Sequence, residues 1–484
     1  MNRIPLASAR TPGAPRPLVV DLDDTLVRTD TLVESVLDLA LSRPIALARV
    51  LPTLLRGRPL FKRRLAELVT LDYASLPYNQ DVLAFIRDRR ATGAEVYLVT
   101  AADQSIADGV ARHLGLFEGA IGSDGAHNLK GSAKATALVD RLGSDFDYIG
   151  DSPADLPVWA VCSDAYVAGN NDAVRRKLGR RGGPAGHFPA TRMTARDWVK
   201  ALRLHQWSKN LLLFITVLLG QHFTEAEVVL RTVAGFIAFG MVASGTYLLN
   251  DIKDVSADRN HYGKRYRAMA SGKLPLHRGL ALALLLLCAG MAGGFALMPD
   301  FGLVLTAYLA LTLTYSLWLK RQPLIDVLAI GALFTVRVQA SVVLTHDKAS
   351  VWLSSFAFVL FTSLATAKRH AELVRARLDQ REISGRGYSA EDLPLTLAVG
   401  IAAASLSIIE MLLYLQLDAR HVGLYERVGG LLLIPVVLTS WLMRVWMKGH
   451  RGELHDDPVI FAIKDKTSIL HALAIAILWL TAVI

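Results

Sequence analysis

Nine apolar segments fill most of this chain after residue 209 and restrict what it can fold into. Most of them approach the roughly 20 residues that a helix needs to cross the hydrocarbon core of a bilayer. We therefore expect an all-α bundle of nine transmembrane helices. The segments lie at about 210–223, 229–249, 279–298, 301–319, 324–344, 351–367, 394–416, 428–446 and 468–484.

Positive charge alternates between the loops of this bundle. The loops after the second, fourth and sixth segments are rich in Lys and Arg, whereas intervening loops such as 298–300 carry almost none. The positive-inside rule therefore predicts that the basic loops are cytoplasmic and that the C-terminus lies outside. We attribute the net charge of +10 to this topology and to phosphate binding, and we expect no nucleic-acid partner.

The first 171 residues differ in character, because short apolar strands alternate there with helical stretches. Residues 18–20, 95–99 and 148–149 are typical of buried parallel strands, and each runs straight into polar residues. A polar domain ahead of a membrane domain also reconciles 52% hydrophobic with 20% charged residues. We expect an α/β domain over 1–171, a basic linker over 172–199 and the membrane domain over 200–484.

Neither a signal peptide nor a disulfide framework is expected. The first residues contain no apolar run, so the N-terminal domain should remain in the cytoplasm, beside the inner membrane. The two cysteines, Cys162 and Cys288, fall in different predicted domains, which argues against a disulfide or a zinc site.

Polar residues suited to phosphate chemistry follow the predicted strands of the α/β domain, and a lysine opens a predicted helix ahead of the third strand. These residues are Asp21, Asp23, Thr100, Lys134, Asp151 and Asp155. Together they resemble the motifs of the haloacid dehalogenase (HAD) superfamily. The resemblance implies a Rossmann-like parallel sheet with a helical cap, which we place at about 32–78.

The HAD resemblance further implies a phosphatase, with Asp21 as the nucleophile and Asp23 as the general acid and base. Thr100 and Lys134 would hold the phosphoryl oxygens, with Lys130 as an alternative lysine. A different interpretation keeps these residues in a domain that serves only as a scaffold or regulator.

Two further roles follow from the same resemblance. Asp151 and Asp155 would complete a Mg²⁺ site with Asp21, and Mn²⁺ would satisfy the same oxygen ligands. The cap at 32–78 is apolar and basic. It would form either a packed pair of helices or an amphipathic surface that rests on the bilayer.

An acidic motif lies directly after the second apolar segment and contains Asn250, Asp251, Asp254 and Asp258. Three of these residues are spaced by four, which places them nearly on one face of a helix. Such a row of oxygen ligands suits Mg²⁺, which takes further ligands from substrate phosphates. The motif therefore predicts a diphosphate-binding site at the membrane surface; a solvated helix end is the alternative.

This motif and the nine predicted helices resemble the UbiA superfamily of intramembrane prenyltransferases over about residues 200–484. Most members use a prenyl diphosphate and an aromatic acceptor, and carry a second acidic motif after the sixth helix. Here the corresponding loop contains Lys368 and Arg369. Basic side chains cannot form a carboxylate cage, but they can bind a phosphate through charge-assisted hydrogen bonds.

Further side chains resemble the decaprenyl-phosphate 5-phosphoribosyltransferase subgroup, which makes polyprenyl-phosphoryl-5-phosphoribose. They are Lys209, Lys264, Arg267, Tyr315, Lys320 and Arg337. For Lys264 and Lys320, a role as topology determinants is an equally good explanation. Arg337 is costly inside a membrane and should face the substrate cavity.

The subgroup resemblance implies two substrates, 5-phosphoribosyl 1-diphosphate and a polyprenyl phosphate in the bilayer. The HAD domain would then remove the 5-phosphate from the lipid product. The alternative function is an aromatic prenyltransferase that uses a prenyl diphosphate, with a HAD domain of regulatory or unrelated role.

Overall fold

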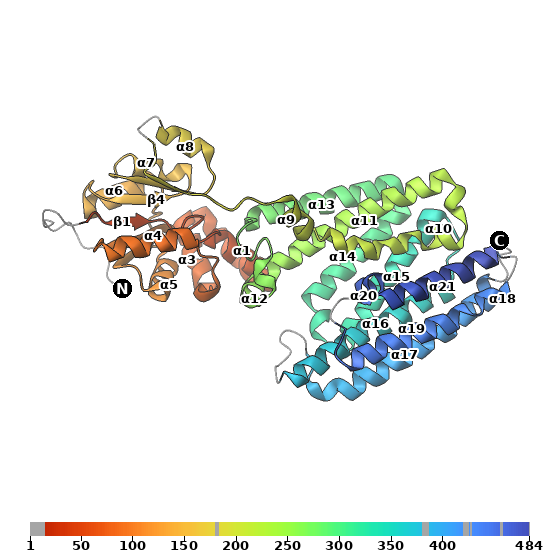
Figure 1. Cartoon of the computed structure of the whole chain (residues 1–484). Helices are drawn as coiled ribbons and strands as arrows, with labels where there is room; N and C mark the ends of the chain where they lie inside the picture. The colour runs from red at the N-terminus through yellow and green to blue at the C-terminus, as the bar shows by residue number, and fades with distance from the viewer. Residues whose placement is uncertain are drawn as a thin grey trace. The chain divides into compact units, whose positions relative to one another are not determined.

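The computed structural model describes residues 15–179, 183–379, 387–419, 425, 428–454 and 458–483 (Figure 1). Residues 1–14, on which most of the signal-peptide prediction rests, lie outside this set. The chain divides into two compact units, Met1–Leu202 with Leu248–Leu282, and Arg203–Tyr247 with Ala283–Ile484. The loop after the second apolar segment, which we predicted within the membrane domain, therefore packs with the first unit.

The first unit contains a six-stranded parallel sheet in the order β3-β2-β1-β4-β5-β6. The α/β prediction is confirmed, and the three predicted strands correspond to β1, β2 and β4. Strand order reverses between β1 and β4, and open α/β sheets bind ligands at such a point. The strands are β1 (Leu18–Val20), β2 (Val96–Asp103), β3 (Gly119–Ser123), β4 (Asp147–Gly150), β5 (Ala165–Ala168) and β6 (Gly186–Phe188).

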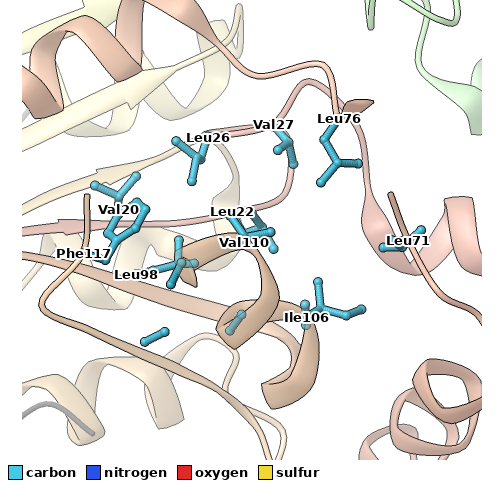
Figure 2. Packing of buried hydrophobic residues seen from close by; sticks show 14 of the residues in the cluster. Val20, Leu22, Leu26, Val27, Leu71, Leu76, Leu98, Ile106, Val110 and Phe117 are labelled. Atoms are coloured by element: carbon cyan, nitrogen blue, oxygen red, sulfur yellow. The ribbon is translucent and has the colours of Figure 1, made fainter. Parts of the chain in front are cut away.

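Both faces of this sheet are covered by apolar side chains, because successive strand residues point to opposite sides. Figure 2 shows Val20, Leu22 and Leu98 on one face, packed with Ile106 and Val110 of α5. Alternate strand residues enter a separate buried cluster with α6, α7 and α8. These helices are α4 (Gln80–Ala91), α5 (Gln104–Leu114), α6 (Ser132–Leu142), α7 (Leu156–Trp159) and α8 (Asp172–Gly179).

The predicted cap is helical. Leu39, Phe61 and Leu65 of α1 and α3 are buried in the core of the first unit, as expected for packed helices. Ile45 of α2 and Leu55 of η1 are 71% and 92% exposed, so this part of the insert presents apolar side chains to its surroundings. The elements are α1 (Thr31–Ser42), α2 (Pro44–Val50), η1 (Leu51–Arg56), α3 (Arg58–Leu68) and η2 (Tyr73–Ser75).

A buried ion pair fastens residues 248–282 to the rest of the first unit. Arg259 of α12 (Val255–Asn260) donates two hydrogen bonds to Glu34 of α1, at 2.6 and 3.0 Å. Its Nε also donates to the carbonyl of Ala270, and Thr29 donates to Glu34 at 3.1 Å. Both charged side chains are almost fully buried, so each depends on the other for its charge compensation.

The second unit is helical, and its helices pack through three apolar clusters. Eight helices among the described residues are long and apolar enough to cross a membrane. These spans are Ala226–Lys253 (α11), Leu276–Leu297 (α13), Pro299–Leu317 (α14), Ile325–Thr345 (α15), Val351–Leu378 (α16), Ala390–Ala419 (with α17, Leu393–Leu413), Gly429–His450 (with α19, Ile434–His450) and Lys466–Val483 (α21).

The predicted count of nine transmembrane helices is therefore not reproduced by the described residues. The predicted first segment, 210–223, does not form one long helix. It is divided between η4 (Leu204–Phe214), a 3-10 helix, and the short α10 (Ile215–Leu219), after which Gln221 adopts a left-handed conformation. Since the C-terminal orientation depended on an odd number of crossings, it stays a prediction.

Small residues allow close helix packing in this unit, for example at Gly290 and Gly294. A Cβ atom on Gly290 would lie 2.8 Å from the carbonyl oxygen of Ala238. A Cβ atom on Gly294 would lie 2.3 Å from the Leu305 side chain. Small side chains at such crossings let helix backbones approach closely.

We predict that Arg259→Ala lowers the free energy of unfolding of the first unit by about 3–5 kcal/mol, because Glu34 would be left as an uncompensated buried charge. Thermal unfolding of the purified protein in detergent micelles measures the change. The exposed Arg265 in the same loop provides a matched control, and Arg265→Ala should cost at most about 0.5 kcal/mol. Equal effects of the two substitutions would contradict the role assigned to the pair. Replacing both partners, Glu34→Leu with Arg259→Met, should recover most of the loss.

Candidate functional site

Three carboxylates meet at the switch point of the sheet in the first unit. Asp21 follows β1, while Asp151 and Asp155 follow β4, and β1 and β4 are hydrogen-bonded neighbours. Each of the three offers an oxygen within 4.8 Å of the others. This is the arrangement that the sequence predicted for these residues.

The electrostatics of this cluster favour a bound cation. Burial raises the pKa of Asp21 to about 6, although Lys134 opposes the rise. Burial and the charges of Asp21 and Asp155 raise the pKa of Asp151 to about 9. A divalent cation beside such carboxylates would favour their charged form. Three carboxylate oxygens are ligands that suit Mg²⁺ or Mn²⁺.

Lys134 reaches this cluster from α6. Its Nζ lies 3.0 Å from Asp21 Oδ1 and 3.5 Å from Asp155 Oδ1, and it donates to the Tyr148 hydroxyl at 3.0 Å. Tyr148 in turn donates to Asp155 at 2.6 Å. The alternative lysine, Lys130, is exposed, so the structure favours Lys134 as the partner of Asp21.

Asp23 is held two residues beyond Asp21. Its Oδ1 accepts hydrogen bonds from the main-chain amide and the hydroxyl of Thr31, both at 2.8 Å. Burial raises the pKa of Asp23 to about 7, and the nearby Asp30 carboxylate adds to the rise. A carboxyl group with a pKa near neutrality is suited to proton transfer in either direction.

Two other side chains complete the surroundings of the cluster. Thr100 is fully buried in β2, where its Oγ1 accepts a hydrogen bond from the Ala102 amide at 3.0 Å. No role for Lys62 of α3 was predicted from the sequence, because it is one of several basic residues in the cap. Its Nζ donates to the Ala101 carbonyl and to Asn128; burial lowers its pKa, although the Asp23 charge opposes this. The cap therefore delivers a cation close to Asp23.

The acidic motif after the second apolar segment forms two hydrogen-bonded groups, one of two residues and one of three. Asn250 donates to Asp254 at 3.1 Å, as expected for residues four apart on a helix. Arg267 donates from Nη1 to both Asp251, at 3.1 Å, and Asp258, at 2.6 Å.

α11 ends at Lys253 and α12 begins at Val255, but main-chain hydrogen bonds of helical spacing cross this boundary, from the Asp254 amide to the Asn250 carbonyl at 2.9 Å and from the Asp258 amide to the Asp254 carbonyl at 2.7 Å. A metal-binding role for the row stays a prediction. Arg267, which we predicted to contact substrate phosphate, compensates two of the carboxylates. Lys264 lies in the same loop, in η6 (Lys264–Tyr266), and is exposed.

Arg337 is buried within α15 in the second unit. Its hydrogen-bond acceptors are all uncharged: Asn210 Oδ1 at 3.0 Å, the Leu333 carbonyl at 2.6 Å and the Tyr308 hydroxyl at 3.2 Å. The guanidinium also lies 5.4 Å from the centre of the Phe334 ring. Asn210 Nδ2 is buried without a hydrogen-bond partner among the described residues. A buried cation beside an unsatisfied amide donor suits an anionic ligand.

Arg369 of α16 has a different environment from the one we expected. It donates to Asp326 at 3.1 Å and forms a second ion pair with Glu372. Tyr388 donates to the other oxygen of Asp326 at 2.5 Å. Two carboxylates therefore already compensate Arg369, and its role as a phosphate ligand, like that of Lys368, stays a prediction.

The remaining predicted residues of the second unit lie on separate elements and are partly buried. Lys209 of η4 lies with its Nζ 5.7 Å from the centre of the Phe334 ring, the ring that also neighbours Arg337. Tyr315 belongs to α14 and Lys320 to η7 (Leu319–Arg321). Lys209 and Arg337 thus neighbour the same aromatic ring.

Comparison with known proteins identifies the membrane part of the chain. The profile of the UbiA prenyltransferase family matches residues 211–463, which is more than half of the chain. The chain belongs to the UbiA prenyltransferase family. With eight apolar helices among its described residues, this UbiA protein is a multi-pass membrane protein and a transferase.

Relatives of this UbiA protein differ in how much of it they match. Uncharacterized protein y4nM of Sinorhizobium fredii is 44% identical over 93% of this chain and 88% of its own length, so the match extends over both units. Nodulation protein NoeC of Azorhizobium caulinodans is 28% identical over 60% of this chain and 94% of its own. Decaprenyl-phosphate phosphoribosyltransferase of Mycobacterium tuberculosis is 35% identical over 36% of this chain and 59% of its own.

Solved structures include a UbiA homolog from Archaeoglobus fulgidus bound to GPP and Mg²⁺. It aligns with 59% of this chain and 99% of its own, at 15% identity and a TM-score of 0.46.

Proposed function

We propose that the UbiA domain transfers phosphoribose from 5-phosphoribosyl 1-diphosphate to a polyprenyl phosphate. The observation that carries this choice is the 35% identity to decaprenyl-phosphate phosphoribosyltransferase of M. tuberculosis. The partly buried Lys368, where most family members would have a second acidic motif, supports a substrate set with additional phosphate.

In the proposed transfer, an oxygen of the lipid phosphate attacks the anomeric carbon of the ribose. The bond from that carbon to the diphosphate breaks, and diphosphate leaves with the bonding electrons. A Mg²⁺ or Mn²⁺ ion on Asn250, Asp251, Asp254 and Asp258 would neutralise the charge that develops on the leaving group. Arg267, already bonded to two of these carboxylates, is positioned to contact a bound diphosphate as well.

Buried basic residues of the second unit would hold the other phosphates. Arg337 and the unpaired amide of Asn210 provide donors for an anion, and Lys209 neighbours the same aromatic ring as Arg337. A buried cation with uncharged partners gains more from an incoming phosphate than an exposed one, because the local dielectric constant is low. Lys264, Tyr315, Lys320 and Lys368 remain candidate substrate ligands.

We further propose that the first unit is a HAD-type phosphatase that removes the 5-phosphate from the lipid product. Asp21 would attack the phosphorus atom, with Lys134 and Thr100 holding phosphoryl oxygens. As the bond to the ribose oxygen breaks, Asp23 would protonate that oxygen. Water would then attack the aspartyl-phosphate, Asp23 would take its proton, and inorganic phosphate would leave.

The two activities would act in sequence. The proposed transfer leaves the 5-phosphate on ribose, and a phosphatase in the same chain would meet this product at a raised effective concentration. The net result would be polyprenyl-phosphoryl-ribose, diphosphate and inorganic phosphate.

The transferase proposal predicts that protein in detergent with Mg²⁺ and polyprenyl phosphate moves label from ribose-labelled 5-phosphoribosyl 1-diphosphate into the lipid fraction. Asp254→Asn should reduce the rate by at least about 100-fold, because a metal ligand is lost. Asp300 is an exposed acidic residue of α14, and Asp300→Asn is the matched control that should keep the rate. Transfer of a prenyl group to an aromatic acid, without labelled lipid, would contradict the proposal.

The phosphatase proposal predicts a pH profile with a falling alkaline limb near pH 7. Asp23 must be protonated to protonate the leaving oxygen, and its pKa is raised to about 7. Asp30→Asn keeps the cap of α1 but removes a charge that raises this pKa, so the limb of kcat/KM should move to lower pH. Asp38→Asn, on the exposed side of α1, should leave the limb in place. An unmoved limb in Asp30→Asn would show that Asp23 does not control the profile.

A further inference from the structure

A cavity of about 800 Å³ in the first unit joins the carboxylate cluster to the loop that belongs to the UbiA sequence. Asp24 and Asp151 line it from the ends of β1 and β4. Residues 272–275 line it from the segment before α13, and residues 277, 278 and 282 line it from the first turns of α13. The phosphatase motifs therefore open into a space that the N-terminal α/β domain does not enclose alone.

The cavity has charges of opposite sign on its walls. Asp151 belongs to the proposed metal site, and Asp24 neighbours both His277 and Arg278, whose charges oppose the rise in the pKa of Asp24 caused by burial. Arg192 and Lys273 add further positive charge to the lining. A phosphate held at the metal site would thus face a second region suited to an anion.

The volume of the cavity and the apolar residues of its lining also restrict which ligands it can bind. Pockets for small organic ligands are typically about 300–1,000 Å³, so this cavity has room for far more than a phosphate ion. Met193, Trp198, Leu274 and Leu282 supply apolar surface beside the basic residues. Such a site fits a sugar phosphate with a second phosphate, followed by an apolar group.

We propose that this cavity binds the phosphatase substrate and that Arg278 and Arg192 hold a second phosphate, which makes the substrate a bisphosphorylated sugar. This inference rests on the proposed function and specifies the substrate class of the same site. The second phosphate would be either the phosphodiester of a lipid-linked phosphoribose or the diphosphate of free 5-phosphoribosyl 1-diphosphate. Arg278, at the start of α13, and Arg192 would then be specificity determinants of the phosphatase.

The test compares release of the 5-phosphate from three substrates by the full-length protein in detergent. They are polyprenyl-phosphoryl-5-phosphoribose, 5-phosphoribosyl 1-diphosphate and ribose 5-phosphate, which has no second phosphate. The wild type should prefer at least one bisphosphorylated substrate over ribose 5-phosphate by about 100-fold in kcat/KM, about 10-fold for each of two charge-assisted hydrogen bonds. Preference for the lipid assigns the second phosphate to the phosphodiester; preference for the free sugar assigns it to the diphosphate.

Arg278→Gln and Arg192→Gln should each lower this preference by about 10-fold, chiefly through KM, and Arg278→Lys should retain part of it. Both arginines are exposed within the cavity lining, so their replacement should not disturb the core. Arg112→Gln, on the exposed side of α5, is the matched control and should keep the wild-type preference. A wild type without preference, or variants that keep it, would overturn the inference. An inactive protein on all three substrates would instead overturn the phosphatase proposal itself.

Discussion

The ion pair between Glu34 and Arg259 is the contact on which the organisation of the first unit depends. It joins a helix of the α/β fold to a loop that lies within the UbiA sequence match. Two buried charges with excellent geometry tolerate little displacement, because separating them leaves each without compensation. The pair therefore fixes residues 248–282, and with them the basic wall of the cavity beside Asp151.

In both acidic clusters of the first unit, carboxylates lie close together and would repel one another, but different basic side chains compensate them. At Asp21, Asp151 and Asp155 the carboxylates are buried together, and Lys134 supplies one positive charge. At Asp251 and Asp258 the guanidinium of Arg267 lies between the two carboxylates. In each cluster a protein cation compensates part of the negative charge, and a divalent ion with a phosphate ligand would compensate the remainder.

Much of the fold could be predicted from the sequence, because the residue patterns of strands and membrane helices lie within short contiguous segments. The strands that precede Asp21 and Asp151 were predicted, and the parallel sheet brings these residues together. The broken segment at 210–223 was not predicted, because its apolar composition suits a 3-10 turn as well as a long helix. Asp326 as a partner of Arg369 and Glu34 as the partner of Arg259 were also missed, since these contacts join residues 43 and 225 positions apart.

The central claim is that one chain first transfers phosphoribose to a lipid and then removes its 5-phosphate. The most direct measurement uses 5-phosphoribosyl 1-diphosphate with tritium in the ribose and radioactive phosphorus in the 5-phosphate, together with polyprenyl phosphate. The account predicts that the lipid fraction gains tritium while the phosphorus label is released as inorganic phosphate, and that Asp21→Asn keeps both labels on the lipid. A wild-type lipid that retains both labels at the ratio of the substrate would contradict it.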